Sequence, residues 1–326
     1  MEAKLNVVIL AHTPEFEQNI VRGAKLCYSS ADIEALKDKV TPEEAQKFLE
    51  MILGLGHGSV LEHSCITFGI EGVSRSLTHQ LVRHRIASYS QKSQRYVKEG
   101  QFSYVIPKDI RNNHRAKEVF IKAMEADQKA YDDLVHILLE GYLEDTDYDT
   151  YQELKENNKN LASSLEKRAI ENARAVLPNA CETKIQVTMN VRTLFNFFKE
   201  RCCDRAQDEI RDMAYKMWLE CIKISPTIFK HAVPSCVNGK CKEGKMSCGK
   251  MAYYKDKHST LRKVYRHEED GTKARVRFED LKVDDIIEMF EPDNETQVFC
   301  EGERYMKVTS IIEPGKIDVM PYQYTL

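Results

Sequence analysis

The sequence predicts an α+β fold, with a helical body around a modest sheet and a small C-terminal β-rich appendage. Long stretches with apolar residues at helical spacing dominate the first 235 residues, and only two short runs there have the pattern of strands. Beyond residue 235, short β-like runs alternate with turn residues. With 326 residues, the chain is long enough to bury a full core and to hold two domains.

The helical body is expected to begin with a strand over residues 5–10. Thr41, Pro42 and Glu44 have the pattern of a capping box with proline at the first helical position, so a helix should begin here and run to about Leu53. Further helices are expected over residues 113–142, 160–176 and 192–223, with a half-buried strand over residues 183–190.

The composition changes after Pro234. Residues 236–260 are rich in Gly, Lys and Cys and predict a linker, and residues 261–326 predict the small β-rich appendage. Nothing in the appendage suggests chemistry, so contact with another protein or capping of the fold is its expected role. Strands are expected within it at residues 264–265, 274–278, 284–290, 297–300, 305–312 and 316–320.

Composition also narrows the classes of function. No run of about eighteen apolar residues exists, which predicts no membrane span, and the N-terminus lacks the order of charge and apolar core of a signal peptide. Ten cysteines without a signal peptide predict reduced thiols in the cytoplasm. The formal net charge of −3 predicts no basic face for a nucleic-acid partner.

Residues 83–96 concentrate three arginines, a lysine, a histidine and three serines in a chain whose 48 basic and 51 acidic residues nearly balance. Arginine presents a fixed fork of donors that fits phosphate or carboxylate, so the segment indicates a site for a phosphorylated ligand. The alternative is a helix from about Val73, whose last turn would carry the basic triplet at 83–85 and so complement the helix dipole. That alternative does not explain the polar loop that continues to Tyr96, and residue types alone leave both interpretations open.

The order of residues in this segment resembles the signature of the flavin-dependent thymidylate synthases: Arg-His-Arg at 83–85, seven residues, Ser93, and then Arg95 and Tyr96. Many members of that family have Asn-Glu where this chain has Ser90-Gln91. Further blocks follow the family's order and extend the resemblance over about residues 20–235. They are residues 27–30, 56–63, 174–178, 190–197 and 201–210.

The resemblance implies a homotetrameric enzyme whose flavin and nucleotide sites lie between subunits, with residues 1–235 as its catalytic domain. The implied reaction converts deoxyuridylate (dUMP), 5,10-methylenetetrahydrofolate and NADPH to thymidylate, tetrahydrofolate and NADP. FAD carries the hydride and relays the methylene group in this reaction. The expected partners are therefore dUMP and further copies of the chain, and neither a membrane nor nucleic acid.

The resemblance also implies the residues of the site. Arg201 is expected to bind the uracil and to help it ionise at N3, which makes C5 nucleophilic, and an always-charged guanidinium suits that role. Deoxyuridylate is expected to contact Gln80, Arg83, Gln91, Ser93, Arg95, Arg174 and Arg201. The flavin is expected to contact His57, Ser59, Arg83, His84, Arg85, Gln91, Asn190, Val191, Arg192 and Asn196.

Other motifs have competing interpretations. Cys236, Cys241 and Cys248, with His231 upstream, are ligand types that suit zinc, but their spacing is looser than a structural zinc knuckle, so zinc and free thiols both stay open and no metal is assigned. The glycines of residues 54–58 follow a predicted helix and lack the spacing of a dinucleotide fingerprint, so a flavin must bind in another way.

Three further expectations concern chemistry. Ser93 has no acid beside it and the chain has no Pro-Cys dipeptide, so no covalent serine or cysteine nucleophile is expected. Arg201 and Arg205 should share one side of a helix, where pairing with Glu209 on an exposed face is the alternative to a ligand. Two other functions stay open: a flavin- and folate-dependent uracil methylase that acts on RNA, and a catalytically inactive nucleotide-binding homologue.

Overall fold

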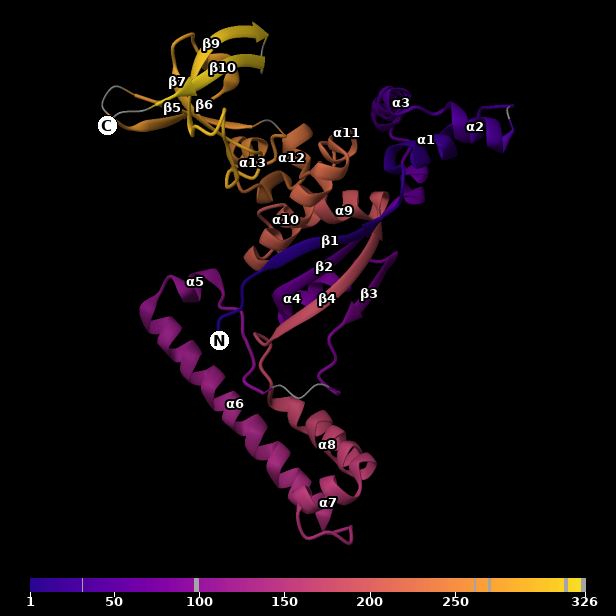
Figure 1. Ribbon diagram of the computed structural model, residues 1–326, viewed down its shortest axis with the longest axis vertical. Coiled ribbons are helices and arrows are strands. Elements are labelled where there is room, and N and C mark those ends of the chain that lie inside the picture. The colour runs from indigo at the N-terminus through magenta and orange to yellow at the C-terminus, as the bar shows by residue number, and fades with distance from the viewer. Residues whose placement is uncertain (31, 97–99, 261, 269–270, 314–315, 324–326) are drawn as a thin grey trace. The chain divides into compact units, whose positions relative to one another are not determined.

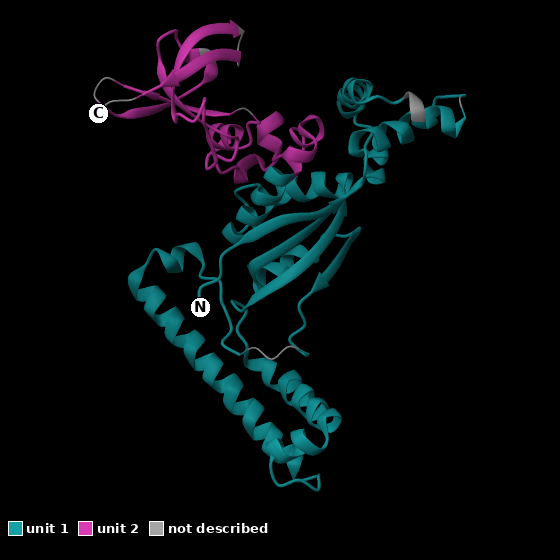
Figure 2. Cartoon of the chain, viewed as in Figure 1, with its two compact units in different colours: residues 1–220 teal, residues 221–326 magenta. Residues whose placement is uncertain are grey.

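The computed structural model in Figure 1 describes residues 1–30, 32–96, 100–260, 262–268, 271–313 and 316–323. The chain forms two compact units, residues 1–220 (unit 1) and 221–326 (unit 2), which Figure 2 colours separately. Each unit contains one antiparallel sheet. The predicted α+β fold class is confirmed.

The sheet of unit 1 has the strand order β1-β2-β4-β3 (Figure 1). Its side chains alternate between two faces, as strands require: Ile66, Phe68, Ile185 and Val187 are buried on one face, and their polar neighbours are more exposed on the other. Both strands predicted in this part of the chain are confirmed to within two residues. The strands are β1 (Asn6–His12), β2 (Cys65–Ser74), β3 (Ala87–Gln91) and β4 (Glu182–Asn190).

Helices α4 (Arg75–Leu81) and α9 (Val191–Arg201) contact β2 and β4 and bury apolar side chains such as Leu77 and Phe197. The helix predicted from Val73 through residue 85 is wrong at both ends. Strand β2 runs through Ser74, whose hydroxyl caps α4 by accepting a hydrogen bond from the Leu77 amide at 3.0 Å. The helix ends before the basic triplet, and the expected polar loop at 87–91 is strand β3 instead.

The single helix predicted over residues 192–223 is two helices, α9 and α10 (Asp208–Ile224). The break at residues 202–207 is held by Arg211, whose Nη1 donates to the backbone carbonyls of Asp204 at 3.3 Å and Ala206 at 2.9 Å. Arg201 and Arg205 therefore do not share a helix, because Arg205 lies within the break.

The remaining helices of unit 1 form two groups. The first is α1 (Phe16–Leu26), α2 (Ile33–Lys39), α3 (Pro42–Leu55) and the short turn η1 (Ser59–His63); the predicted start of α3 is confirmed by a hydrogen bond from the Glu44 amide to Thr41 Oγ1. The second is α5 (Lys108–Arg111), α6 (His114–Leu143), α7 (Tyr151–Asn157), α8 (Lys159–Ala173) and η2 (Arg174–Val176). Helices α6 and α8 pack through Tyr131, Val135, Ala169 and Ile170, and both were predicted.

Unit 2 begins with short helices and continues into a six-stranded antiparallel sheet of order β10-β9-β7-β5-β6, with β8 beside β7. Val264, Ile287, Met306 and Val308 form its core. All six predicted strand runs are confirmed, whereas Leu261, the first residue of the predicted appendage, lies outside the described residues. The elements are α11 (Pro226–Phe229), α12 (Ser235–Asn238), η3 (Gly244–Met246), α13 (Met251–Lys257), β5 (Lys263–His267), β6 (Lys273–Val276), η4 (Phe278–Asp280), β7 (Ile286–Phe290), β8 (Gln297–Val298), β9 (Tyr305–Glu313) and β10 (Lys316–Tyr322).

Each of the ten cysteines lies in the described part of the chain and is a free thiol. Within the same residues, no helix is long and apolar enough to cross a bilayer.

Candidate active site

The basic triplet lies in a tight turn between α4 and β3. Ile86 has a φ of 63°, in the left-handed region, which lets the chain reverse from the helix into the strand. The Tyr89 hydroxyl lies 2.9 Å from the Leu81 carbonyl and 2.8 Å from the His84 carbonyl, and Thr193 Oγ1 donates to the Ile86 carbonyl at 3.2 Å. Burial raises the pKa of Tyr89 to about 12, so its hydroxyl stays a donor and fixes the turn.

This turn presents Arg83 and Arg85 outward and turns His84 inward. Both arginines are exposed, and neither has an ion-pair or hydrogen-bond partner among the side chains that the structure describes. His84 is 7% exposed, and its ring meets Phe197 edge to face at 4.9 Å between centroids. Two guanidinium groups are therefore available to an anionic ligand on the same turn.

His84 holds Arg201, the last residue of α9. Arg201 Nε donates to His84 Nε2 at 2.8 Å. Burial and then the charge of Arg201 lower the pKa of His84, against an opposing effect of Glu200, so the ring is neutral and can accept this hydrogen bond. Among the described residues, no hydrogen bond or ion pair is found for the terminal nitrogens of Arg201, which leaves them available to a ligand.

The first turn of α9 faces η1. Asn190 caps the helix by accepting from the Thr193 amide at 2.8 Å, so its side chain has a structural role as well as its predicted flavin contact. Arg192 Nη1 pairs with Glu62 Oε1 at 2.5 Å, which ties α9 to η1. Asn196 lies one turn after Arg192 and is exposed, whereas Val191 is fully buried and can offer only its backbone.

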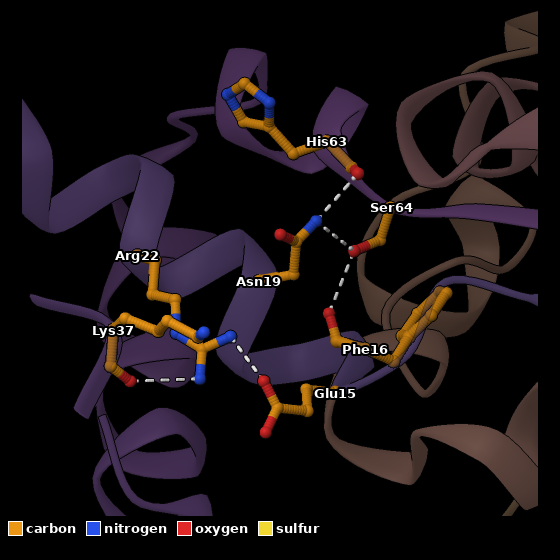
Figure 3. Close-up of polar contacts among 7 residues, drawn as sticks. All are labelled: Glu15, Phe16, Asn19, Arg22, Lys37, His63 and Ser64. Atoms are coloured by element: carbon orange, nitrogen blue, oxygen red, sulfur yellow. Dashed lines mark hydrogen bonds and ion pairs between the residues drawn. The ribbon is translucent and has the colours of Figure 1, made fainter. Parts of the chain in front are cut away.

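Figure 3 shows the contacts that position η1. Ser59 is the first residue of η1, and His57 precedes it by two residues. Asn19 Nδ2 donates to the His63 carbonyl at 2.8 Å and to Ser64 Oγ at 3.3 Å, and Ser64 Oγ donates to the Phe16 carbonyl at 2.9 Å. These contacts attach η1 to α1. His57 and Ser59 are exposed at this end of the sheet, near the same helix α9.

A second group of predicted residues gathers at the end of α8. Arg95 Nε lies 2.6 Å from Glu171 Oε1, and Arg174 follows Glu171 by three residues. The Ser93 hydroxyl accepts a hydrogen bond from the Arg95 amide at 3.1 Å. Arg174 is half-buried and has no carboxylate partner among the described residues. Ser93, Arg95 and Arg174 are thus brought together, as a phosphate site requires.

The two groups lie at opposite ends of β3. Ala87 pairs with Met189, next to the start of α9, whereas Gln91 pairs with Ile185. Four residue steps of about 3.4 Å separate these positions by about 14 Å, before the chain continues to Ser93. We refer to these two groups as two half-sites, one at each end of β3.

Gln80 and Gln91 lie between or beside these groups. Gln80 Nε2 donates to Gln207 Oε1 at 2.5 Å, which places Gln80 beside the break that follows Arg201. Gln91 Nε2 lies 3.0 Å from Thr78 Oγ1 and 3.3 Å from Thr183 Oγ1, so this side chain links β3 to α4 and β4.

Glu209 does not lie on an exposed face beside Arg205. It accepts hydrogen bonds from the Ser74 amide and from the Ser74 hydroxyl, each at 2.7 Å. Burial raises the pKa of Glu209 in spite of these two hydrogen bonds. Glu209 therefore anchors the start of α4 and does not lie on the exposed helix face that the alternative interpretation required.

One hollow of about 520 Å³ lies on the polar face of the sheet. The Lys184–Glu71 ion pair, 2.9 Å long, crosses its lining, and Gln91 is the one predicted site residue that lines it. In the described part of the chain, no three His, Cys, Asp or Glu side chains are grouped so that they could hold a metal ion, and this includes Cys236, Cys241, Cys248 and His231.

Three residues of this site were missed in the sequence. Tyr89 and Thr193 fix the turn, and Thr78 binds Gln91. A tyrosine four residues after a basic triplet is a weak signal, because its hydroxyl binds carbonyls that only the folded turn brings within reach.

Comparison with known proteins shows the family to which the chain belongs. Residues 8–227 match the family described as thymidylate synthase complementing protein. The chain is 51% identical to a flavin-dependent thymidylate synthase of Clostridium tetani over 251 residues, which cover 77% of this chain and 96% of the relative. It is 44% identical to one of Geobacter sulfurreducens over 254 residues, which cover 77% and 97%.

A solved structure also has a related fold. It is a UMP/dUMP methylase from Streptomyces cacaoi bound with 5-Br dUMP, with a TM-score of 0.51 and 19% identity, covering 70% of this chain and 94% of that one. The resemblance inferred from the signature around residues 83–96 is therefore confirmed, and the roles of individual residues stay predictions. The chain belongs to the thymidylate synthase complementing protein family.

Proposed function

We propose that the chain is a flavin-dependent thymidylate synthase, which methylates dUMP with 5,10-methylenetetrahydrofolate and takes its reducing equivalents from NADPH. The observation that carries this proposal is the contact between His84 and Arg201, which leaves a fixed guanidinium free at the end of α9. The names of the relatives, which are flavin-dependent thymidylate synthases, support the reaction class.

The residues near α9 fit a flavin dinucleotide. Arg83 and Arg85 are exposed without partners among the described residues, and α9, which carries Arg192, is joined to their turn by the hydrogen bond from Thr193 to the Ile86 carbonyl. We propose that these arginines bind the pyrophosphate. The flavin, when bound, supplies the hydride and relays the methylene group. We propose that His57, Ser59 and Asn196 complete this pocket, that Asn190, Val191 and Gln91 shape it, and that His84 contributes through Arg201.

Arg201 carries the protein's part of the chemistry. A guanidinium beside the uracil stabilises negative charge on the ring and disfavours the proton at N3, so that C5 becomes more nucleophilic. Nε is held by His84, so Nη1 and Nη2 are pre-oriented and little reorganisation is needed when charge develops. Gln80, attached to Gln207, lies at the same end of the site.

The phosphate end of dUMP is proposed to bind Ser93, Arg95 and Arg174. Because this group lies at the far end of β3 from Arg201, we propose that each site combines the two half-sites of different subunits in a homotetramer. When the phosphate binds, Arg95 would either break its ion pair with Glu171 or bind both Glu171 and the phosphate. The ion pair would weaken because a carboxylate beside a phosphate is unfavourable.

A mixing experiment tests the shared site. Arg201→Ala and Arg174→Ala should each be nearly inactive alone, but co-assembled oligomers should recover a fraction of sites that have both arginines. A mixture that stays as inactive as its parents, in oligomers shown to be mixed by differential tags, would reject the shared site.

The function itself is tested by tritium release from dUMP labelled at C5. Release should require 5,10-methylenetetrahydrofolate and NADPH, and the purified protein should carry a flavin spectrum. A flavin-loaded protein without release would indicate the inactive homologue, and methylation of uracil in RNA instead of dUMP would indicate the RNA methylase. A cytoplasmic location is part of the proposal and agrees with ten free thiols.

A further inference from the structure

Unit 2 contains a lysine-rich segment, residues 238–257, that lies beyond the part of the chain matched by the family. The segment has six lysines, no arginine and two carboxylates, so its formal charge is +4 in a chain whose net charge is −3. The lysines are Lys240, Lys242, Lys245, Lys250, Lys255 and Lys257. Charges further apart than about 8 Å are largely screened at physiological salt, so the local charge decides what this surface attracts.

The segment is folded but almost entirely exposed. Residues 242–253 are all exposed. The backbone is held by hydrogen bonds from the Met246 amide to the Glu243 carbonyl at 2.9 Å and from the Tyr254 amide to the Lys250 carbonyl at 3.1 Å. Helix α12 packs against α13, where Tyr254 is buried. The lysines are therefore displayed on a fixed scaffold.

Four of these lysines differ from several other cations of unit 2, because no acidic partner is found for them among the described residues. Three cations in or next to the strands are paired: Arg262 with Glu291 at 3.0 Å, Arg275 with Asp256 at 2.5 Å, and Lys307 with Asp284 at 2.8 Å. By contrast, no carboxylate among the described residues pairs with Lys240, Lys242, Lys245 or Lys255. One of the two carboxylates of the segment, Asp256, is already neutralised by Arg275. The positive charge of these four lysines is therefore available to an external anion.

An aromatic ring lies among these charges. Tyr253 is 55% exposed, and Lys257 Nζ lies 6.0 Å from the centre of its ring. Lys250 precedes Tyr253 by three residues, at helical spacing on the same side of α13. An exposed ring can stack on an unpaired base, and lysine binds phosphate as a point charge without the bidentate fork that reads base edges.

We propose that residues 238–257 bind single-stranded nucleic acid without sequence preference. The lysines bind successive phosphates, and the Tyr253 ring stacks on a base. This function is independent of dUMP turnover, because it uses residues outside the family match. It also revises the expectation from net charge alone, which predicted no nucleic-acid partner.

The test is fluorescence anisotropy of the full chain with a labelled oligo-dT of about 12 nucleotides. If about four phosphates are neutralised, the slope of log affinity against log salt is about −2.8, so affinity should fall about 50-fold between about 50 and 200 mM salt. The variant Lys240→Glu, Lys242→Glu, Lys245→Glu should lose at least about tenfold in affinity at low salt.

The matched control changes three exposed lysines of unit 1, with the same effect on net charge. Lys47→Glu, Lys108→Glu, Lys122→Glu should bind the oligonucleotide within about twofold of the wild type, since only local charge counts. Both triple variants should release tritium from dUMP as the wild type does. Equal losses in the two triple variants would overturn the assignment to residues 238–257.

A second pair of variants tests the proposed stacking of the Tyr253 ring on a base. Tyr253→Ala should weaken binding by at least about fivefold, and Tyr253→Phe should keep it, because the ring and not the hydroxyl contacts the base. The proposal is overturned if duplex DNA of equal length binds as tightly, if affinity is independent of salt, or if anionic vesicles or polyglutamate bind while oligo-dT does not.

Discussion

His84→Phe should separate the orientation of Arg201 from the binding of the flavin. Phenylalanine can keep the edge-to-face contact with Phe197, but it removes the acceptor for Arg201 Nε. His84→Gln is the conservative partner, because its amide oxygen can still accept a hydrogen bond. The fold should survive both changes, since a ring of similar size fills the same space.

The expected loss of rate in His84→Phe follows from the one hydrogen bond that is lost, between His84 and Arg201. A hydrogen bond to a charged group contributes about 1.5–3 kcal/mol, which corresponds to about 10- to 150-fold in rate if the whole effect falls on the transition state. kcat should therefore fall by about that factor in His84→Phe and by less in His84→Gln. KM for dUMP should change little, because the phosphate half-site at Arg95 and Arg174 is untouched.

The assay is single-turnover tritium release at saturating dUMP and folate, with flavin content measured by absorbance. If His84 acts through Arg201, flavin content should match that of the wild type while kcat falls. Loss of flavin with a normal rate per bound flavin would refute this reasoning and make His84 a direct flavin contact. The wild type should also lose activity at acid pH, because protonated His84 cannot accept the hydrogen bond from Arg201. The pKa of His84 is lowered by burial and then by the charge of Arg201, so this loss should occur below the ordinary histidine range. The pH–rate profile of His84→Phe should lack this acid limb.

Four other predictions follow from separate observations. Arg174→Ala should weaken dUMP binding by about 10- to 150-fold in calorimetry, as loss of a charged hydrogen bond does. Gly72→Ala should destabilise the protein by about 2–4 kcal/mol in denaturant titrations, because its φ is 71° and a Cβ would lie 1.9 Å from a backbone oxygen, whereas Gly54→Ala has open space and should be neutral or stabilising. Burial lowers the pKa of His258 from 6.5 to about 4, so the unfolded chain binds a proton at a higher pH than the folded chain does. Unit 2 should therefore lose about 3 kcal/mol of stability as the pH falls from 6.5 to about 4. His258→Gln should not show this loss. A chain that lacks residues 261–326 should keep its dUMP turnover, because the family match ends at residue 227.

Much of the fold could be predicted because local patterns agreed with the final structure. The helix over 113–142 and the six β runs of unit 2 have strong periodicity and clear turn residues, so tertiary packing did not override them. The helix over 192–223 failed because its break depends on Arg211, which binds two carbonyls of the connection. Periodicity continued through the break, and nothing local marked it.

The resemblance implied the residues of the candidate site and a position between subunits, but not where each residue lies along the sheet. The signature at 83–96 is continuous in sequence, which suggests one pocket. In the structure the segment is a turn followed by strand β3, and a strand moves its residues apart by about 3.4 Å at each step. The same continuity that made the signature recognisable therefore places Arg83 and Arg95 at different ends of the sheet.

The hollow on the sheet contains only a small part of the proposed site. The hollow of about 520 Å³ on the sheet is lined by Gln91 but by neither Arg201 nor Arg174. An extended strand that carries flavin-binding residues at one end and phosphate-binding residues at the other can serve two sites at once, provided that a second copy supplies the missing half of each. Under the roles proposed for Arg201, Arg95 and Arg174, assembly is a requirement for chemistry, because the two half-sites lie at opposite ends of β3 and a different copy would supply each half of one nucleotide site.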